Sequence, residues 1–242
     1  MLANIKKMFM INASHVATCL GVNPYCIRES TCLLNSNKSA GEKHAMEMGK
    51  QLEPMVKRMY LSKWSGPLHE QSNSHVRAAY TVPIRGVCDI LLTGKIRDQS
   101  VRCIVELKTS KYQRRKLLQT HFIQTLAYMQ IYLANWGEVA VYHKKSGTTK
   151  LFFIRPSQLI IIFQRLLHEC SRTLREGYLQ PLNKMQLVRV RQLVKSEMER
   201  CIVLVQDEKH LMHLRRKNCA PTSHTLENIL RDLTMKAGKA QG

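Results

Sequence analysis

The chain has 242 residues, with 38 Lys and Arg against 17 Asp and Glu, which gives a formal net charge of +21. A hydrophobic fraction of 44% supports a packed core and argues against a disordered chain. No apolar run approaches the ~18 residues of a membrane span, so we expect no membrane-spanning segment. The excess of cations favours a polyanionic partner such as nucleic acid, which would relieve their mutual repulsion.

Hydrophobic periodicity and Gly or Pro breaks divide the chain into helices and strands. The predicted helices span residues 13–20, 42–63, 115–135, 156–176 and 185–203. The predicted strands span residues 75–82, 84–92, 101–109, 138–143 and 150–154. The close spacing of the first three strands is typical of an antiparallel meander. The predicted fold is therefore α/β, with a small mixed sheet that contains this meander and is flanked by helices.

The composition changes after Pro181. Residues 182–242 contain 12 Lys and Arg and 6 Asp and Glu, and the end of the chain is weakly patterned. We therefore expect a domain of residues 1–181 and a basic helical C-terminal extension of residues 182–242 that is partly flexible. The extension could grip DNA nonspecifically, direct nuclear import or contact another subunit, and its charge favours the first role.

Eight cysteines are present, but no two of them form a Cys-x-x-Cys pair. Without a signal peptide, this pattern indicates reduced thiols in an intracellular protein that is not secreted. Cys201, His213, Cys219 and His224 would form a zinc site of irregular spacing, and an iron–sulfur cluster would need four cysteines to converge. We expect neither site.

Carboxylates are scarce in residues 1–181, yet two of them lie in apolar strands. Because strand residues alternate between faces, Glu106 and Lys108 share one face, and Asp89 can meet them from the neighbouring strand. An unpaired carboxylate is costly in such surroundings, and Mg²⁺ is commonly bound by one or two carboxylates plus a substrate phosphate. Lys108 would orient or deprotonate a water, or neutralise charge on the phosphate. The alternative is a solvated strand face with a weak ion pair.

Further motifs occur in a fixed order around these residues. Ala13-Ser14 leads to Gly21-Val22-Asn23-Pro24-Tyr25, Gly49-Lys50-Gln51-Leu52-Glu53-Pro54 follows, and Asp89 precedes Glu106-Leu107-Lys108 and a helix with Gln124 and Tyr128. Over roughly residues 7–155 this order resembles the PD-(D/E)XK nuclease superfamily, and within it the YqaJ and bacteriophage lambda exonuclease group of viral recombinases. The chain departs from the pattern at Cys88, where proline is typical. The resemblance implies a restriction-endonuclease-like core.

The resemblance also implies roles for individual side chains. The metal ligands would be Asp89, Glu106, the Leu107 carbonyl and Glu53, the last directly or through water. Lys108 would position the attacking water. Gln124 and Tyr128, one helical turn apart, would orient the site and touch the DNA backbone. The alternative for this last pair is an ordinary amphipathic helix with a half-buried tyrosine.

Two basic segments are candidates for DNA contacts. Lys7, Asn12 and Ser14 match positions that grip a 5′ phosphate in lambda-type enzymes, and Ser14 would cap a helix whose free N–H groups attract an anion. The alternative for Ser14 is a helix cap with no phosphate contact. The second segment follows the catalytic strand directly and comprises Lys111, Arg114, Arg115 and Lys116. We expect phosphate contacts from it, although such a run is more often a solvated face.

The predicted function is Mg²⁺-dependent hydrolysis of DNA from duplex ends, 5′→3′, for recombination or repair, with Mn²⁺ as a substitute metal. The resemblance further suggests a homo-oligomeric ring, a partner single-strand annealing protein, and a location in the nucleus or cytoplasm of an infected cell. Two alternatives remain. One is a structure-specific or nonspecific endonuclease on the same core, and the other is a catalytically silent basic DNA-binding accessory protein of recombination.

Overall fold

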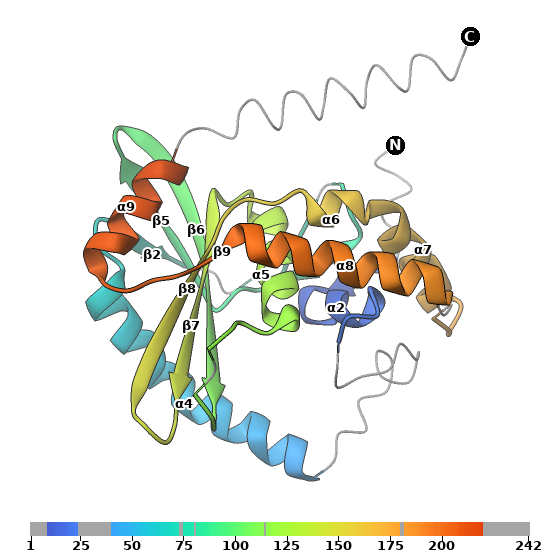
Figure 1. The fold of residues 1–242 in the computed structure, drawn as a ribbon, viewed down its shortest axis with the longest axis horizontal. Coiled ribbons are helices and arrows are strands. Elements are labelled where there is room, and N and C mark those ends of the chain that lie inside the picture. The colour runs from blue at the N-terminus through green and yellow to red at the C-terminus, as the bar shows by residue number, and fades with distance from the viewer. Residues whose placement is uncertain are drawn as a thin grey trace.

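The computed structural model describes residues 9–23, 40–72, 75–79, 81–113, 115–179 and 182–219, which form two sheets flanked by helices (Figure 1). The strands are β1 (Ile11–Asn12), β2 (His69–Gln71), β3 (Arg77–Ala78), β4 (Ile84–Gly86), β5 (Ile90–Ile96), β6 (Gln99–Ser110), β7 (Trp136–His143), β8 (Thr148–Ile154) and β9 (Ile202–Leu204). The helices are the 3-10 helix η1 (Ala13–His15), α2 (Val16–Cys19), α4 (Ala40–Trp64), α5 (Gln119–Tyr132), α6 (Leu159–Ile162), α7 (Gln164–Arg175), α8 (Lys184–Cys201) and α9 (Glu208–Asn218). No helix within these residues is long and apolar enough to cross a membrane.

The larger sheet has six strands in the order β2-β5-β6-β7-β8-β9. It is mixed, because β6 and β7 are parallel while the other neighbours are antiparallel. A parallel pair needs a crossover connection, and α5 provides it. The smaller sheet has the order β1-β4-β3. The predicted α/β class, with a mixed sheet flanked by helices, is confirmed.

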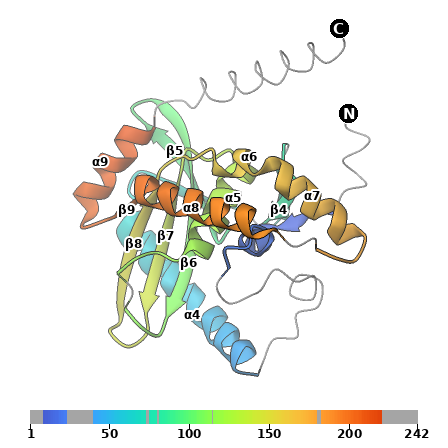
Figure 2. The same cartoon turned by 45° about the vertical axis from the view of Figure 1, so that its right-hand side comes forward.

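Helices cover both faces of the larger sheet. One face, with Ile104 of β6 and Val139 of β7, packs against a core that includes α5 and α2. The opposite face, with Val105 and Ala140, packs against α4 and α9. Figures 1 and 2 show the same arrangement, with α5 and α8 on one side of the sheet and the long α4 crossing the other.

The predicted strand of residues 84–92 is two strands in the structure. β4 ends at Gly86 and belongs to the smaller sheet, whereas β5 begins at Ile90 and belongs to the larger one. Residues 87–89 make the passage between the sheets. The predicted strand of residues 75–82 is reduced to β3, and the predicted helix of residues 156–176 is interrupted at Phe163.

Residues 182–219 contribute to the larger sheet and to its core. Asn183 caps the N-terminus of α8, and its side chain accepts from the Gln186 backbone N–H in a capping box. β9 then pairs with β8, and α9 brings Arg215 into the interior. The sequence predicted α8 but neither β9 nor α9. A domain boundary at residue 181 stays a prediction, and residues 220–242 lie outside the described part.

A buried ion pair joins α9 to the sheet. Arg215 and Glu138 of β7 are both fully buried, and two guanidinium nitrogens donate to the two carboxylate oxygens at 2.8 and 3.0 Å. The Tyr60 hydroxyl of α4 donates to Glu138 Oε2 at 2.6 Å, and the Trp136 indole donates to Oε1 at 2.9 Å. Every oxygen of this buried carboxylate is therefore paired.

We expect Arg215→Ala to destabilise the protein by about 3–5 kcal/mol, because it leaves the Glu138 carboxylate buried without its counter-charge. Urea denaturation measures the free energy of unfolding. The matched control is Arg216→Ala, which removes an exposed arginine from the same helix and should change stability by less than about 0.5 kcal/mol. Equal stability of the two variants would contradict the importance of the buried pair.

Candidate active site

Asp89 lies directly before β5, alongside the strand that carries Glu106. The register pairs Ile90 with Val105, so one further step places Asp89 across from Glu106. The Leu107 backbone N–H donates to Asp89 Oδ2 at 2.6 Å. This hydrogen bond fixes the Asp89 carboxylate against β6, so the structure brings Asp89 together with the segment from Glu106 to Lys108.

Glu106 is a fully buried carboxylate that is only half satisfied. Its Oε2 accepts from Lys108 Nζ at 2.7 Å, whereas its Oε1 is buried without a hydrogen-bond partner. Burial raises the pKa of Glu106 to about 7; Lys108 opposes this rise and the nearby Asp89 adds to it. An unpaired buried oxygen calls for a water or an ion beside it.

Lys108 lies on the same face of β6 as Glu106, and its side chain is 20% exposed. Burial lowers its pKa, but the negative charges of Glu106, Asp89 and Glu53 outweigh this effect, so the net pKa of Lys108 is raised. The amine is therefore a cation, surrounded by the three carboxylates that the sequence analysis selected.

Glu53 approaches the site from α4, which packs on the face of the sheet opposite to α5. A Cβ on Gly49, one turn earlier, would lie 3.6 Å from Thr109 Oγ1, so α4 passes close to the end of β6. Glu53 is exposed, and its pKa is raised by partial burial and then by Asp89, while Lys108 lowers it. Glu53 thus lies within electrostatic range of both residues.

Gln124 and Tyr128 approach from α5. Tyr128 is buried, and its pKa is raised first by burial and then by Glu106, while a hydrogen bond with the Gln124 side chain lowers it. Its ring packs tightly on β4, because a Cβ on Gly86 would lie 2.7 Å from Tyr128 Cε1. All six residues predicted as catalytic therefore contribute to one cluster.

Cys88 occupies the position where the resembling family typically has proline. The thiol is buried and donates to the Ile90 carbonyl at 3.4 Å. Burial, and then the nearby Glu106, raise its pKa to about 12, so the sulfur stays protonated at neutral pH.

No group of three His, Cys, Asp or Glu side chains gathers closely enough to hold a metal ion within residues 9–23, 40–72, 75–79, 81–113, 115–179 and 182–219. Of the zinc candidates, Cys201 and Cys219 donate to the carbonyls of Pro156 and Arg216, and His224 lies outside the described residues. The side chains of Glu53, Asp89 and Glu106 are likewise too far apart in this structure to bind one metal ion together.

The segment predicted to bind a 5′ phosphate lies beside β4, the strand that precedes Asp89. β1 runs parallel to β4, and Arg85 Nε donates to Asn12 Oδ1 at 3.4 Å. Asn12 and Ser14 are exposed, and Lys7 lies outside the described residues. The prediction that Ser14 caps a helix was wrong. Ser14 lies within η1, where Asn12 occupies the N-cap position and makes no side-chain capping bond.

Arg85 is not among the residues predicted from the sequence to bind phosphate. Its one signal in the sequence is a charge within an apolar run, and only the pairing of β1 with β4 reveals that this charge lies beside Asn12.

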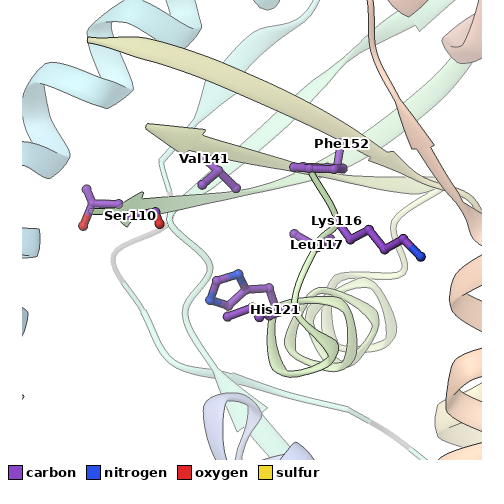
Figure 3. Close-up of a pocket in the computed structure, with 8 residues that line it drawn as sticks. Ser110, Lys116, Leu117, His121, Val141 and Phe152 are labelled. Carbon is purple, nitrogen blue, oxygen red and sulfur yellow. The ribbon is translucent and has the colours of Figure 1, made fainter. Parts of the chain in front are cut away.

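The basic segment after β6 is exposed at Lys111, Arg115 and Lys116, while Arg114 lies outside the described residues. Lys116 lines a cavity of about 230 Å³ between the end of β6 and the start of α5. Figure 3 shows the His121 ring turned towards Ser110 and Val141, with Lys116 extended to the other side. Thr109 and Ser110, the two residues that follow Lys108 on β6, also line this cavity.

No protein-family model matches the chain, and no curated protein does. Among solved structures, the alkaline exonuclease LHK-Exo from Laribacter hongkongensis is 13% identical, with a TM-score of 0.46, over 81% of this chain and 92% of that chain. Its complex with dAMP is 13% identical, with a TM-score of 0.45, over 88% and 95%. SSO0001 is 14% identical, with a TM-score of 0.42, over 81% and 79%.

We expect Gly86→Ala to destabilise the protein by about 1–3 kcal/mol, because the added methyl group would collide with the Tyr128 ring. The matched control is Gly49→Ala, which has room at 3.6 Å within a helix and should be neutral or slightly stabilising. Thermal denaturation compares the variants. In a Tyr128→Ala background the added methyl group should cost less, and an unchanged cost would contradict this contact.

We expect Glu106 to make the metal-free protein less stable as the pH rises from 4.5 to about 7, the range between its unfolded and folded pKa values. In that range the folded chain retains a proton on Glu106 that the unfolded chain releases, so the unfolding free energy falls by up to about 3 kcal/mol. Urea denaturation in EDTA, compared with Glu106→Gln, isolates this effect. Parallel pH profiles of the two proteins would contradict a raised pKa at Glu106.

Proposed function

We propose that the chain is a metal-dependent deoxyribonuclease that hydrolyses phosphodiester bonds and digests duplex DNA from its ends, 5′→3′. The observation that carries the proposal is Glu106, a buried carboxylate with one oxygen on Lys108 and one oxygen without a partner, next to Asp89. A purely structural ion pair gains nothing from leaving a buried oxygen unpaired.

The residues fit a hard divalent cation. Asp89, Glu106, the Leu107 carbonyl and Glu53 offer oxygen atoms, which Mg²⁺ and Mn²⁺ prefer. Mg²⁺ keeps several waters and needs only one or two carboxylates, so an open cluster suits it. When bound, the metal would polarise the scissile phosphate and supply an activated water.

The side chains around this position would orient the substrate. Lys108, held beside Glu106, would donate hydrogen bonds to the attacking water or to the phosphate oxygen that gains charge during hydrolysis. Tyr128 and Gln124 would hold the Glu106 side chain in its orientation and contact the DNA backbone. These contacts go to phosphates rather than base edges, so we expect no sequence specificity.

Exposed cations on two sides of the site support binding of DNA. Asn12 and Ser14, together with Arg85, would hold a 5′ phosphate, and Lys111, Arg115 and Lys116 would contact phosphates further along the strand. A ring-shaped oligomer, a partner annealing protein, a role in recombination or repair, and a nuclear or cytoplasmic location stay predictions of the sequence resemblance.

We expect Asp89→Asn and Lys108→Ala each to reduce Mg²⁺-dependent digestion of linear duplex DNA by at least about 100-fold. Asn at position 89 can still accept from the Leu107 N–H, so the fold should persist. The matched controls, Asp98→Asn and Lys95→Ala, change exposed charges at the far end of the β5–β6 hairpin and should retain activity. Equal activity of all four variants would remove the site assignment.

The same preparation distinguishes the alternatives. A covalently closed circular duplex should remain intact, and a 5′-labelled linear duplex should release its label early as a mononucleotide. Cutting of the circle would favour the endonuclease, and absence of Mg²⁺- or Mn²⁺-dependent cleavage would favour the silent DNA-binding protein.

A further inference from the structure

Tyr112 is an exposed aromatic residue directly beyond the catalytic strand. Its side chain is 62% exposed, two residues after β6 ends at Ser110. Tyr112 lies four positions after Lys108, so the two Cα atoms are at most about 13 Å apart. A base bound on the Tyr112 ring would therefore lie within a few nucleotides of a phosphate at Lys108.

The backbone of Tyr112 is anchored although its ring is exposed. The Ser110 hydroxyl donates to the Tyr112 carbonyl at 2.7 Å, and Nδ1 of the buried His143 donates to the same oxygen at 3.0 Å. These two hydrogen bonds come from the C-terminal ends of the parallel strands β6 and β7, which lie side by side (Figure 1). Because the Tyr112 backbone is already held in place, less conformational entropy is lost when a ligand stacks on the exposed Tyr112 ring.

Two lysines lie over the Tyr112 ring. Lys111 Nζ is 5.5 Å and Lys145 Nζ is 5.8 Å from the ring centroid, the second reaching across from the turn between β7 and β8. Cation–π contacts are weak at exposed positions. A nucleic-acid base can replace either lysine over the ring, and the displaced amine can turn to the adjacent phosphate.

We propose that Tyr112 is a stacking platform for an unpaired base of single-stranded DNA, with Lys111 and Lys145 binding the flanking phosphates. An aromatic face within a basic surface suits single strands, because every exposed base offers a face for stacking while the bases of a duplex are already stacked. A protein partner fits less well, since Lys111 and Lys145 lie over the ring and interface cores are poor in charge. The inference rests on the proposed function in that it brings DNA to this edge.

The test is binding of a short fluorescein-labelled oligothymidine in EDTA, measured by fluorescence anisotropy. We expect Tyr112→Ala to weaken binding about tenfold, and Tyr112→Phe to retain it, because a phenyl ring also stacks. The matched control is Tyr178→Ala, which removes another exposed tyrosine, 45% exposed after α7, and should bind as the wild type does. Equal binding by Tyr112→Ala and the wild type would overturn the proposal.

A second measurement separates stacking from a general loss of positive surface. An oligonucleotide of abasic sites has phosphates but no bases, so Tyr112→Ala should bind it as tightly as the wild type does. An equal loss on both oligonucleotides would overturn the stacking role. Because EDTA prevents cleavage, this result is independent of catalysis: a loss confined to oligothymidine supports the platform even if Asp89→Asn leaves digestion unchanged.

Discussion

The organisation of the site depends on one carboxylate that β6 carries into the interior. Glu106 has no exposed surface, and only one of its oxygens has a partner, the Lys108 amine. Burial alone would favour the protonated acid, while the neighbouring lysine favours the anion. The opposing effects leave a group whose charge depends on what lies beside its free oxygen. Asp89 adds negative charge beside it, and Glu53 lies within electrostatic range of Asp89 and Lys108, which further favours a cation in this cluster.

A second buried glutamate in the same sheet shows what a structural carboxylate looks like here. Glu138 lies on the neighbouring strand β7 but on the opposite face, where Arg215, Tyr60 and Trp136 donate to both its oxygens. Both oxygens of Glu138 are occupied by these donors, so neither oxygen is available to bind a ligand. Glu106 and Glu138 are equally buried, so the difference between them is the free oxygen and not burial.

Strand alternation and apolar flanks were enough to predict the cluster of Asp89, Glu106 and Lys108, because those signals are local. The break between β4 and β5 was not predictable in this way. Residues 84–92 form one apolar run. The chain passes from the smaller to the larger sheet within this run because β4 pairs with β1, a distant segment of the chain. Arg215 was similarly misjudged as part of a basic tail, since its partner Glu138 lies 77 residues away in the sequence.

The parallel pairing of β6 and β7 explains why Lys111, Tyr112 and Lys145 lie together beyond the strand that carries Glu106. Parallel strands end at the same edge, so Ser110 lies beside His143, and the segment of Lys111 and Tyr112 lies beside the turn that carries Lys145. An antiparallel pairing would send these ends to opposite edges. The crossover helix α5 must return from that edge along the face of Glu106, which is how Tyr128 reaches the buried carboxylate. One choice of strand direction thus brings Lys111 and Lys145, the exposed Tyr112 ring and the half-satisfied Glu106 towards the same end of the sheet.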